Sequence, residues 1–252
     1  MPAIQAVFFD IDGVIIDTER DGHRVSFNLT FKEFGFTDEW SVDHYHELLQ
    51  VAGGKERLKH DWKTRGWSRP VSEGEIDELI RAMHKRKTTI FVELIESLKL
   101  PLRPGVHRFM QEAMKAGLRI AVCTTSNEQA AKAVTEKALP DIRFEAVLAG
   151  DVVSKKKPDP EIYNLALQRM GLQPHQAFVV EDSHNGLEAA KAAGLRVVVT
   201  TNGYTEKEDV SRGDIIVTCL GDPAGQKGEL RKGSVVFDGV LHVDQVVRYF
   251  SN

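Results

Sequence analysis

Cysteine is scarce: the chain of 252 residues has only two, Cys123 and Cys219. Two cysteines cannot form a disulfide framework, and the apolar run around Cys123 predicts a buried thiol, so a reducing compartment fits best. No apolar run approaches the ~18 residues that a membrane-spanning helix needs, and the first expected strand, which starts by Ile4, leaves no room for a signal peptide. We therefore expect a cytoplasmic protein, or one of the plastid stroma if a transit peptide has been removed.

Charge of one sign is not in large excess either. The 33 basic and 37 acidic residues give a net charge of −4, with no long run of one sign. This balance excludes a nucleic-acid-binding arm and a membrane-surface helix, so we expect no nucleic-acid or membrane partner. Hydrophobic residues make up 42% and charged residues 28%, which excludes disorder and is typical of a globular enzyme. At about 150 residues per domain the length predicts one or two domains, and we expect a monomer.

Four short apolar runs predict the buried strands of a sheet. They cover residues 6–9, 119–123, 177–180 and 196–199. Strands that are apolar almost throughout are buried on both faces, as in a parallel sheet covered by helices. Helix start and stop signals lie between the runs, for example Pro104 before one segment and Gly117 after it. This alternation predicts an α/β fold with a doubly wound parallel sheet.

A long stretch after the first strand lacks strand patterns. Apolar residues there recur mostly at spacings of 3 and 4 residues, which predicts one helix over 19–34 and a longer one over 72–98. Ser72 followed by Glu75 predicts a capping box at the start of the longer helix.

We therefore expect two domains. A small all-helical domain of residues 18–99 is inserted into an α/β core domain of residues 1–17 and 100–252. The segment 100–105 contains two prolines, which predict a stiff hinge. Near the C-terminus, residues 235–243 predict a hairpin.

Polar residues follow three of the predicted strands where each strand ends. Asp10 and Asp12 follow the first strand, Thr124, Thr125, Ser126 and Asn127 the second, and Glu181 and Asp182 the third. Ligands of an open parallel sheet bind outside the carboxyl ends of its strands, near the point where the strand order reverses. We therefore expect these groups to converge on one crevice.

Asp10, Asp12, Glu181 and Asp182 would bring up to four carboxylates together there. Two unit charges ~4 Å apart repel by about 4 kcal/mol at an effective dielectric constant of ~20, so a cation must lie among them. Oxygen ligands without clustered His or Cys indicate Mg²⁺, which also takes water and substrate phosphate as ligands. We therefore expect a magnesium cofactor.

Other residues suit the binding of a phosphoryl group. Thr124 and the backbone amides after it can donate hydrogen bonds, and Lys157 can supply positive charge. Lys157 is favoured over Lys155 and Lys156 because the adjoining Pro158 constrains its backbone.

Asp10 and Asp12 suit covalent phosphoryl transfer. With a metal ion on one side and Lys157 on the other, Asp10 can attack phosphorus in line and form an aspartyl-phosphate. Asp12 lies two residues further on, so it can donate a proton to the leaving oxygen and later take one from water.

The segments Asp10-Ile11-Asp12-Gly13, Thr124, Lys157-Pro158 and Glu181-Asp182 resemble, in this order, the four motifs of the haloacid dehalogenase (HAD) superfamily. The resemblance implies that Asp10 is the nucleophile and Asp12 the general acid and base. It implies phosphate binding by Thr124, Thr125 and Lys157. The implied magnesium ligands are Asp10, the Asp12 carbonyl and Asp182, with Glu181 acting through water. The helical insertion resembles the small cap of β-phosphoglucomutase-like members, which closes over the substrate.

A narrower resemblance is to the CbbY-type proteins, which are xylulose-1,5-bisphosphate phosphatases. It rests on the segments 17–19, 21–24, 53–57 and 150–153. It implies that one phosphate of the substrate is cleaved at Asp10 while the cap binds the other, for which Lys55 and Arg57 offer positive charge. The implied substrate-binding residues are Glu19, His23, Gly54, Lys55, Arg57, Ser126 and Asn127.

Some of these residues have a second interpretation. Asn127 can equally cap a helix N-terminus, and His23 can pack inside the cap. Lys55 and Arg57 can simply solvate the start of a helix. The sequence leaves these alternatives open.

Other functions are compatible with part of the pattern. A phosphomutase like β-phosphoglucomutase uses the same aspartates but returns the phosphoryl group to a sugar, so the core motifs do not separate it from a phosphatase. A signalling receiver domain also phosphorylates an aspartate, but it is much shorter than this chain. A binding protein without activity would not need every group that the chemistry requires. We therefore predict a Mg²⁺-dependent phosphatase that acts on a small phosphorylated sugar, xylulose 1,5-bisphosphate.

Overall fold

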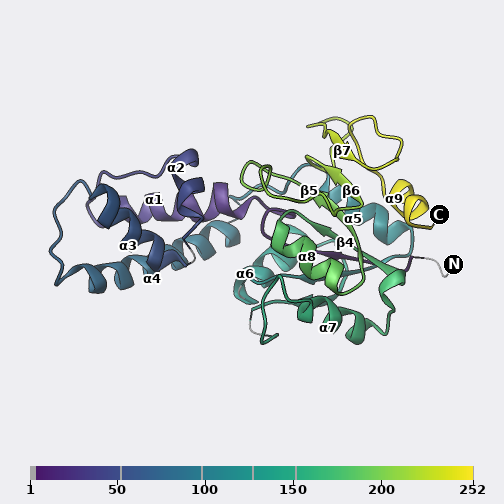
Figure 1. Ribbon diagram of the computed structural model, residues 1–252, viewed down its shortest axis with the longest axis horizontal. Helices are drawn as coiled ribbons and strands as arrows, with labels where there is room; N and C mark the ends of the chain where they lie inside the picture. Colours follow the sequence, from purple (N-terminus) through teal and green to yellow (C-terminus); the bar gives the residue numbers. More distant parts are fainter. Residues whose placement is uncertain (1–3, 52, 98, 127, 151, 252) are drawn as a thin grey trace. The chain divides into compact units, whose positions relative to one another are not determined.

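The computed structural model of this protein describes residues 4–51, 53–97, 99–126, 128–150 and 152–251. The chain divides into two compact units, Met1–Asp17 with Pro101–Asn252 and Thr18–Leu100. We refer to the first as the sheet unit and to the second as the helical unit (Figure 1). Leu100 belongs to the helical unit, one residue beyond the boundary expected from the sequence.

The sheet unit is built on one seven-stranded sheet with the strand order β3-β2-β1-β4-β5-β6-β7. Neighbouring strands are parallel except for β6 and β7, which are antiparallel. The strands are β1 (Ala6–Phe9), β2 (Arg119–Cys123), β3 (Phe144–Leu148), β4 (Ala177–Glu181), β5 (Arg196–Thr200), β6 (Ile215–Val217) and β7 (Leu230–Lys232). The four apolar runs thus form the strands β1, β2, β4 and β5.

Helices cover both faces of this sheet, which explains why its central strands are apolar throughout. The helices of this unit are α5 (Val106–Lys115), α6 (Glu128–Ala133), α7 (Glu161–Met170), α8 (His184–Ala192) and α9 (Val243–Ser251), with the short π-helix η2 (Val134–Ala138) and the short 3₁₀-helix η3 (Pro174–Gln176). On one face Phe8 belongs to the same apolar cluster as Tyr163 of α7. On the other face the ring centroids of Phe9 and Phe109 of α5 are 6.3 Å apart. The predicted α/β fold with a doubly wound parallel sheet is confirmed.

The helical unit packs its helices around aromatic rings. It consists of η1 (Thr18–His23), α1 (Arg24–Glu33), α2 (Val42–Leu48), α3 (Gly54–Arg65) and α4 (Ile76–Glu96). The ring centroids of Phe27 and Trp40 are 4.6 Å apart and those of Trp40 and Tyr45 are 5.7 Å apart, and all three side chains are buried. In the described part of the chain, no helix combines the length and the apolar composition that a membrane span requires.

The start of the longest helix differs from the expectation. α4 begins at Ile76, and no side chain caps it. The hydroxyl of Ser72 donates to the carboxylate of Glu75 at 2.6 Å instead of accepting from the Glu75 amide. The predicted capping box is therefore wrong, because residues 73–75 form a turn and the Ser72 hydroxyl is engaged by the Glu75 side chain rather than by a backbone amide.

The segment before α9 also differs from what the sequence predicts. Residues 235–242 contain no strand, so the hairpin predicted there is wrong, and the antiparallel pair is instead β6 with β7. The guanidinium of Arg108 in α5 donates to the carbonyls of Leu220 at 3.0 Å, Gly221 at 2.8 Å and Leu241 at 3.0 Å. The segment also pairs through its backbone with preceding residues, because the Leu241 amide donates to the carbonyl of Leu220 at 2.9 Å and the Gly239 carbonyl accepts from the Gly228 amide at 2.8 Å.

A buried carboxylate organises the polar contacts of the helical unit. Asp61 of α3 is fully buried and accepts hydrogen bonds from the indole nitrogens of Trp40, at 2.8 Å, and Trp67, at 3.1 Å. It also lies 2.9 Å from Nε of Arg65 and 2.7 Å from Nε2 of His44. A buried charge is stable only while such donors are in place, so Asp61 holds several segments of this unit together.

We expect Asp61→Ala to lower the free energy of unfolding of the helical unit by about 3 kcal/mol, because it leaves buried donors without a partner. All three tryptophans lie in this unit, so a denaturant titration followed by tryptophan fluorescence reports on it. Asp77→Ala is the control, because its ion pair with Lys59 lies on the surface and contributes little. Equal losses of stability in the two variants would contradict the role of Asp61.

Candidate active site

The candidate active site lies at the carboxyl ends of β1 and β4. β1 lies between β2 and β4, so connections from this point run to both sides of the sheet, which is where open α/β sheets bind ligands. Asp10 follows β1 directly, and its backbone amide donates to the carbonyl of Val180 at 3.2 Å. Glu181 is the last residue of β4, and Asp182 follows it. The sheet thus brings together carboxylates that are far apart in the sequence.

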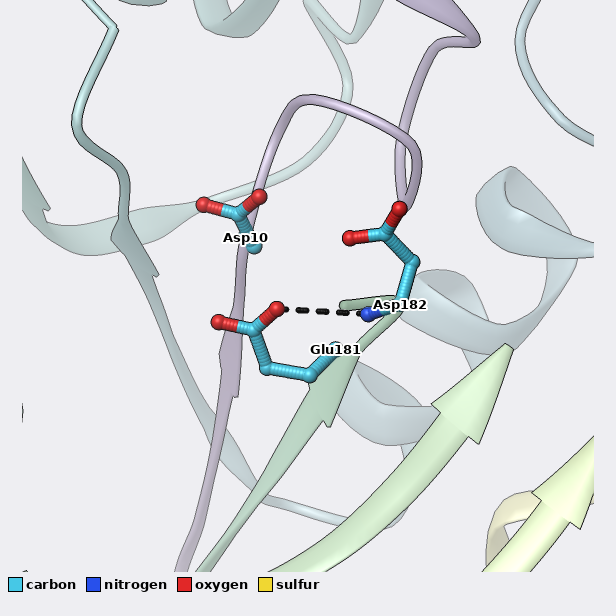
Figure 2. A group of neighbouring side chains, drawn as sticks. All are labelled: Asp10, Glu181 and Asp182. Atoms are coloured by element: carbon cyan, nitrogen blue, oxygen red, sulfur yellow. Dashed lines mark hydrogen bonds between the residues drawn. The ribbon is translucent and has the colours of Figure 1, made fainter. Parts of the chain in front are cut away.

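Figure 2 shows the resulting group of Asp10, Glu181 and Asp182. Each contributes a carboxylate oxygen, and these oxygens all lie within 4.8 Å of one another. The residues are 7%, 0% and 5% exposed, respectively. The backbone amide of Asp182 donates to Oε2 of Glu181 at 3.2 Å, which fixes the Glu181 side chain (Figure 2). We refer to these three residues as the acidic cluster; their oxygens can hold a metal ion together.

Lys157 supplies positive charge to the acidic cluster. Its Nζ atom lies 2.7 Å from Oδ1 of Asp10, 2.7 Å from Oε1 of Glu181 and 2.9 Å from the carbonyl of Cys123. The neighbouring lysines have other partners: Lys155 pairs with Asp159, and Lys156 donates to a backbone carbonyl outside the cluster. The structure therefore places the lysine next to Pro158, rather than its neighbours, against the predicted nucleophile.

Burial and mutual repulsion raise the pKa of two carboxyl groups in the acidic cluster. Burial, with the charges of Glu181 and Asp12, raises the pKa of Asp10 to about 7, although Lys157 opposes the shift. Burial and the charges of Glu181 and Asp10 also hold the pKa of Asp182 well above its usual range. Burial disfavours the charge of Lys157, but the two carboxylates beside it outweigh burial and raise the pKa of its amine. The cluster thus has excess negative charge that a bound cation would balance.

Asp12 and the loop after β2 form the second part of the site. The hydroxyl of Ser126 donates to the carboxylate of Asp12 and so orients it. Thr124 is fully buried, and its hydroxyl oxygen accepts from the Ser126 amide at 3.1 Å. Thr125 is exposed in the same loop. Asn127 lies outside the described residues, so its two interpretations stay open.

Two residues that contact the acidic cluster were not predicted. The hydroxyl of Tyr163 in α7 donates to the carboxylate of Glu181, and Nδ2 of Asn202 donates to Oδ2 of Asp182 at 2.7 Å. Asn202 follows β5 near its carboxyl end, so the rule that identified the other polar residues at strand ends can also find it. Tyr163 lies on the apolar face of a helix, where nothing in the sequence distinguishes it from a core residue.

In the helical unit, two predicted substrate-binding residues are joined by a tyrosine. The hydroxyl of Tyr45 donates to Oε2 of Glu19 at 2.7 Å and accepts from Nη1 of Arg57 at 3.3 Å. Nε of Arg57 also donates to the carbonyl of Val51 at 2.9 Å. These bonds fix the direction of both charged side chains.

His23 lies beside a buried lysine of the same unit. Its Nδ1 atom is 2.7 Å from Nζ of Lys87, and its ring centroid is 3.9 Å from that of Phe91. Burial, followed by the positive charges of Lys87, Arg57 and His84, holds the pKa of His23 well below its usual range. His23 therefore both packs inside the unit and lies among cationic groups.

The start of α3 is close to these groups. A side chain at Gly54 would lie 2.8 Å from the ring of His84, so the start of α3 packs closely on that ring. Lys55 is exposed in the first turn of α3. We refer to Lys55, Arg57 and Lys87 as the cationic cluster, beside which lie the rings of His23 and His84. Lys87 was not predicted, although the sequence contains a signal: a lysine in the apolar stripe of a helix, four residues after Met83, is unusual.

Comparison of the sequence with known proteins shows the family to which the chain belongs. A family model described as haloacid dehalogenase-like hydrolase matches residues 4–194, and the chain belongs to this family. A protein named "CBBY-like protein" from Arabidopsis thaliana is 49% identical over 229 residues, which cover 89% of this chain and 72% of that protein. "Protein CbbY" from Rhodobacter capsulatus is 41% identical over 227 residues, which cover 88% of this chain and 96% of that protein.

A solved crystal structure is also similar to this chain in sequence and in fold. It is a crystal structure of a CbbY mutant from Rhodobacter sphaeroides in complex with xylulose-(1,5)bisphosphate. It has 36% sequence identity and a TM-score of 0.69, and the match covers 88% of this chain and 97% of that chain. Within the family, this chain is therefore an enzyme of the CbbY type, a phosphatase, as the sequence motifs predicted.

We expect Asp10→Asn to raise the melting temperature of the metal-free protein near neutral pH. The pKa of Asp10 is raised from 3.8 to about 7 in the folded state, so its charge destabilises the fold. This penalty is absent below pH 3.8, grows as the pH rises and is complete above about 7. Thermal denaturation in the presence of a chelator at several pH values measures it.

The exposed pair of Asp244 with Arg248 provides a control variant, Asp244→Asn, for which no such gain is expected. In chelator above pH 7, a lower melting temperature for Asp10→Asn than for the unaltered protein would contradict the claim that the Asp10 charge destabilises the fold.

Proposed function

We propose that this phosphatase hydrolyses xylulose 1,5-bisphosphate with Mg²⁺ through an aspartyl-phosphate on Asp10. The observation that carries the proposal is the buried Asp10 carboxylate, paired at 2.7 Å with Lys157 and grouped with Asp182. A carboxylate surrounded by one positive side chain and by oxygen donors for a cation can attack a phosphoryl group despite its own charge. In this proposal the helical unit acts as the cap domain, which binds the rest of the substrate.

The residues present fit Mg²⁺. Asp10, Asp182 and the backbone carbonyl of Asp12 would hold the ion, with Glu181 acting through water. An oxygen-only donor set supports this choice, as does the raised pKa of Asp10 and Asp182, because both indicate negative charge without a sufficient partner. When bound, the ion would balance this charge and polarise the phosphoryl oxygens.

The reaction then follows from the positions of the two aspartates. A carboxylate oxygen of Asp10 attacks phosphorus, and the bond between phosphorus and the sugar oxygen breaks while Asp12 donates a proton to that oxygen. Water next attacks the phosphorus of the aspartyl-phosphate and gives its proton to Asp12, and the bond to Asp10 breaks to release inorganic phosphate. The hydrogen bond from Ser126 supports the role of Asp12, because it orients the carboxylate. Thr124, Thr125 and Lys157 bind the transferred group.

Two observations support a sugar bisphosphate as the substrate. The related CbbY from Rhodobacter sphaeroides is described in complex with xylulose-(1,5)bisphosphate. The cationic cluster of the helical unit also offers the positive charge that a second phosphate needs, with Lys55 and Arg57 as its donors. Glu19, His23 and Gly54 would complete this part of the binding site, while Ser126 and Asn127 would contact the substrate from the sheet unit.

We expect Mg²⁺-dependent release of phosphate, with kcat/KM for xylulose 1,5-bisphosphate exceeding that for monophosphates by about 10- to 100-fold. This ratio corresponds to one charge-assisted interaction worth ~1.5–3 kcal/mol with the second phosphate. The measurement is phosphate release across a panel that also contains ribulose 1,5-bisphosphate and β-glucose 1-phosphate. A chelator and the Asp10→Asn variant are both expected to abolish it.

The same panel separates the phosphatase from the mutase. Conversion of β-glucose 1-phosphate to glucose 6-phosphate without free phosphate would contradict hydrolysis and favour a sugar phosphomutase.

We expect Lys55→Ala to lower kcat/KM for the bisphosphate by about 10-fold or more and to leave monophosphates nearly unchanged. The reason is that Lys55 is proposed to contact only the second phosphate. Lys59→Ala is a matched control, because Lys59 lies about one turn later on α3 and pairs with Asp77. Equal losses for both classes of substrate would remove Lys55 from this role.

A further inference from the structure

Arg103 of the sheet unit connects three segments of the chain near the acidic cluster. It lies just before α5, and its guanidinium donates to the backbone carbonyls of Thr200 at 2.9 Å, Thr201 at 2.7 Å and Thr218 at 2.9 Å. It also donates to the carbonyl of Gly13 and to the hydroxyl oxygen of Thr200, the latter at 3.0 Å. One planar group thus joins the loop after β1 to the ends of β5 and β6.

The Gly13 side of this connection borders the acidic cluster directly. The Gly13 amide donates to the carbonyl of Ile16 at 2.7 Å, and its φ of +77° requires glycine. A side chain at this position would overlap the carboxylate of Asp182 and lie 2.7 Å from Nδ2 of Asn202. Since its amide, its α-carbon and its carbonyl all have close neighbours, Gly13 has little room to shift. The peptide group between Asp12 and Gly13 is therefore fixed as well.

The contacts of Arg103 at the end of β5 are also connected to the carboxylate of Asp182. Thr200 and Thr201 directly precede Asn202, whose side chain donates to Oδ2 of Asp182 at 2.7 Å. Arg103 thus acts on Asp182 by two routes, through Gly13 and through the loop that holds Asn202. Burial lowers the pKa of the guanidinium, and the negative charges of Asp182 and Asp17 counteract this effect. The arginine therefore also adds positive charge on the side of the cluster where Asp182 lies.

We propose that Arg103 is a positioning residue that holds the Asp12–Gly13 loop and Asp182 in the arrangement that binds the metal ion. A guanidinium bonds several carbonyl oxygens at once in fixed directions, which the amine of lysine cannot do. The inference rests on the proposed function in so far as that function requires Mg²⁺. It adds a residue that contacts neither the substrate nor the ion.

The test compares Arg103→Lys with Arg108→Lys. Arg108 is a matched control, because its guanidinium also donates to backbone carbonyls of the sheet unit, those of Leu220, Gly221 and Leu241. For each variant the melting temperature is measured against Mg²⁺ concentration, and kcat and KM are measured with p-nitrophenyl phosphate.

We expect Arg103→Lys to raise the Mg²⁺ concentration for half-maximal stabilisation by about 10-fold and to lower kcat by about 10-fold, typical of residues that support metal ligands. KM is expected to change by less than about threefold, because the residue does not touch substrate. Arg108→Lys is expected to lower the melting temperature in chelator without moving the Mg²⁺ midpoint. Equal Mg²⁺ midpoints for the two variants would overturn the proposal.

A second variant covers the case in which Arg103→Lys does not fold. Thr200→Val removes one acceptor and keeps the guanidinium, and we expect it to shift the Mg²⁺ midpoint in the same direction by about twofold; no shift would overturn the proposal. Absence of Mg²⁺ stabilisation in the unaltered protein would refute both the metal site and the role of Arg103. Failure to hydrolyse xylulose 1,5-bisphosphate, with Mg²⁺ stabilisation intact, would refute only the substrate.

Discussion

The interaction on which the site depends is the contact of one lysine amine with two buried carboxylates. Lys157 lies 2.7 Å from both Asp10 and Glu181, and none of the three side chains is substantially exposed. Without this amine the burial of Asp10, Glu181 and Asp182 so close together would be prohibitively unfavourable. Even with the Lys157 amine in place, the pKa of Asp10 is raised to about 7. The site therefore has excess negative charge, which a bound metal ion would balance.

The surrounding fold is arranged to keep these charges in place. Glu181 accepts from Lys157, from Tyr163 and from the Asp182 amide, and Asp182 accepts from Asn202. The first turn of α8 packs so closely on Glu181 that a side chain at Gly186 would overlap its carboxylate. Since the N-terminus of a helix favours nearby negative charge, this contact also stabilises the cluster. Each carboxylate is thus held by groups from different elements of the sheet unit.

Much of this arrangement could be predicted because it follows from two strong signals. Continuous apolar runs identified the central strands, and polar residues at the strand ends identified Asp10, Asp12 and Asp182. β3 gave no such signal, because it is an edge strand with alternating exposed residues, and β6 and β7 have only three residues each. The capping box was wrong because residues 73–75 form a turn and the Ser72 hydroxyl bonds the Glu75 carboxylate instead of a backbone amide.

The residues that sequence patterns missed act through tertiary contacts. Tyr163 and Arg103 belong to no periodic pattern at the site, and their hydrogen-bond partners are distant in the sequence. In the helical unit, Lys87 occupies an apolar position of α4, which the sequence reveals, but its contact with His23 depends on how α4 packs. Motifs therefore identify the polar groups at the strand ends, whereas Tyr163 and Arg103 are found only in the folded chain.

The central claim is that Asp10 is the nucleophile that accepts the phosphoryl group during catalysis. The most direct test is to quench the reaction with xylulose 1,5-bisphosphate in acid during turnover and to analyse the peptide that contains Asp10 by mass spectrometry. The account predicts a phosphoryl group on Asp10 that is present only while substrate remains. Release of free phosphate with no phosphorylated Asp10 at any time, in a quench that preserves a synthetic acyl phosphate, would contradict it.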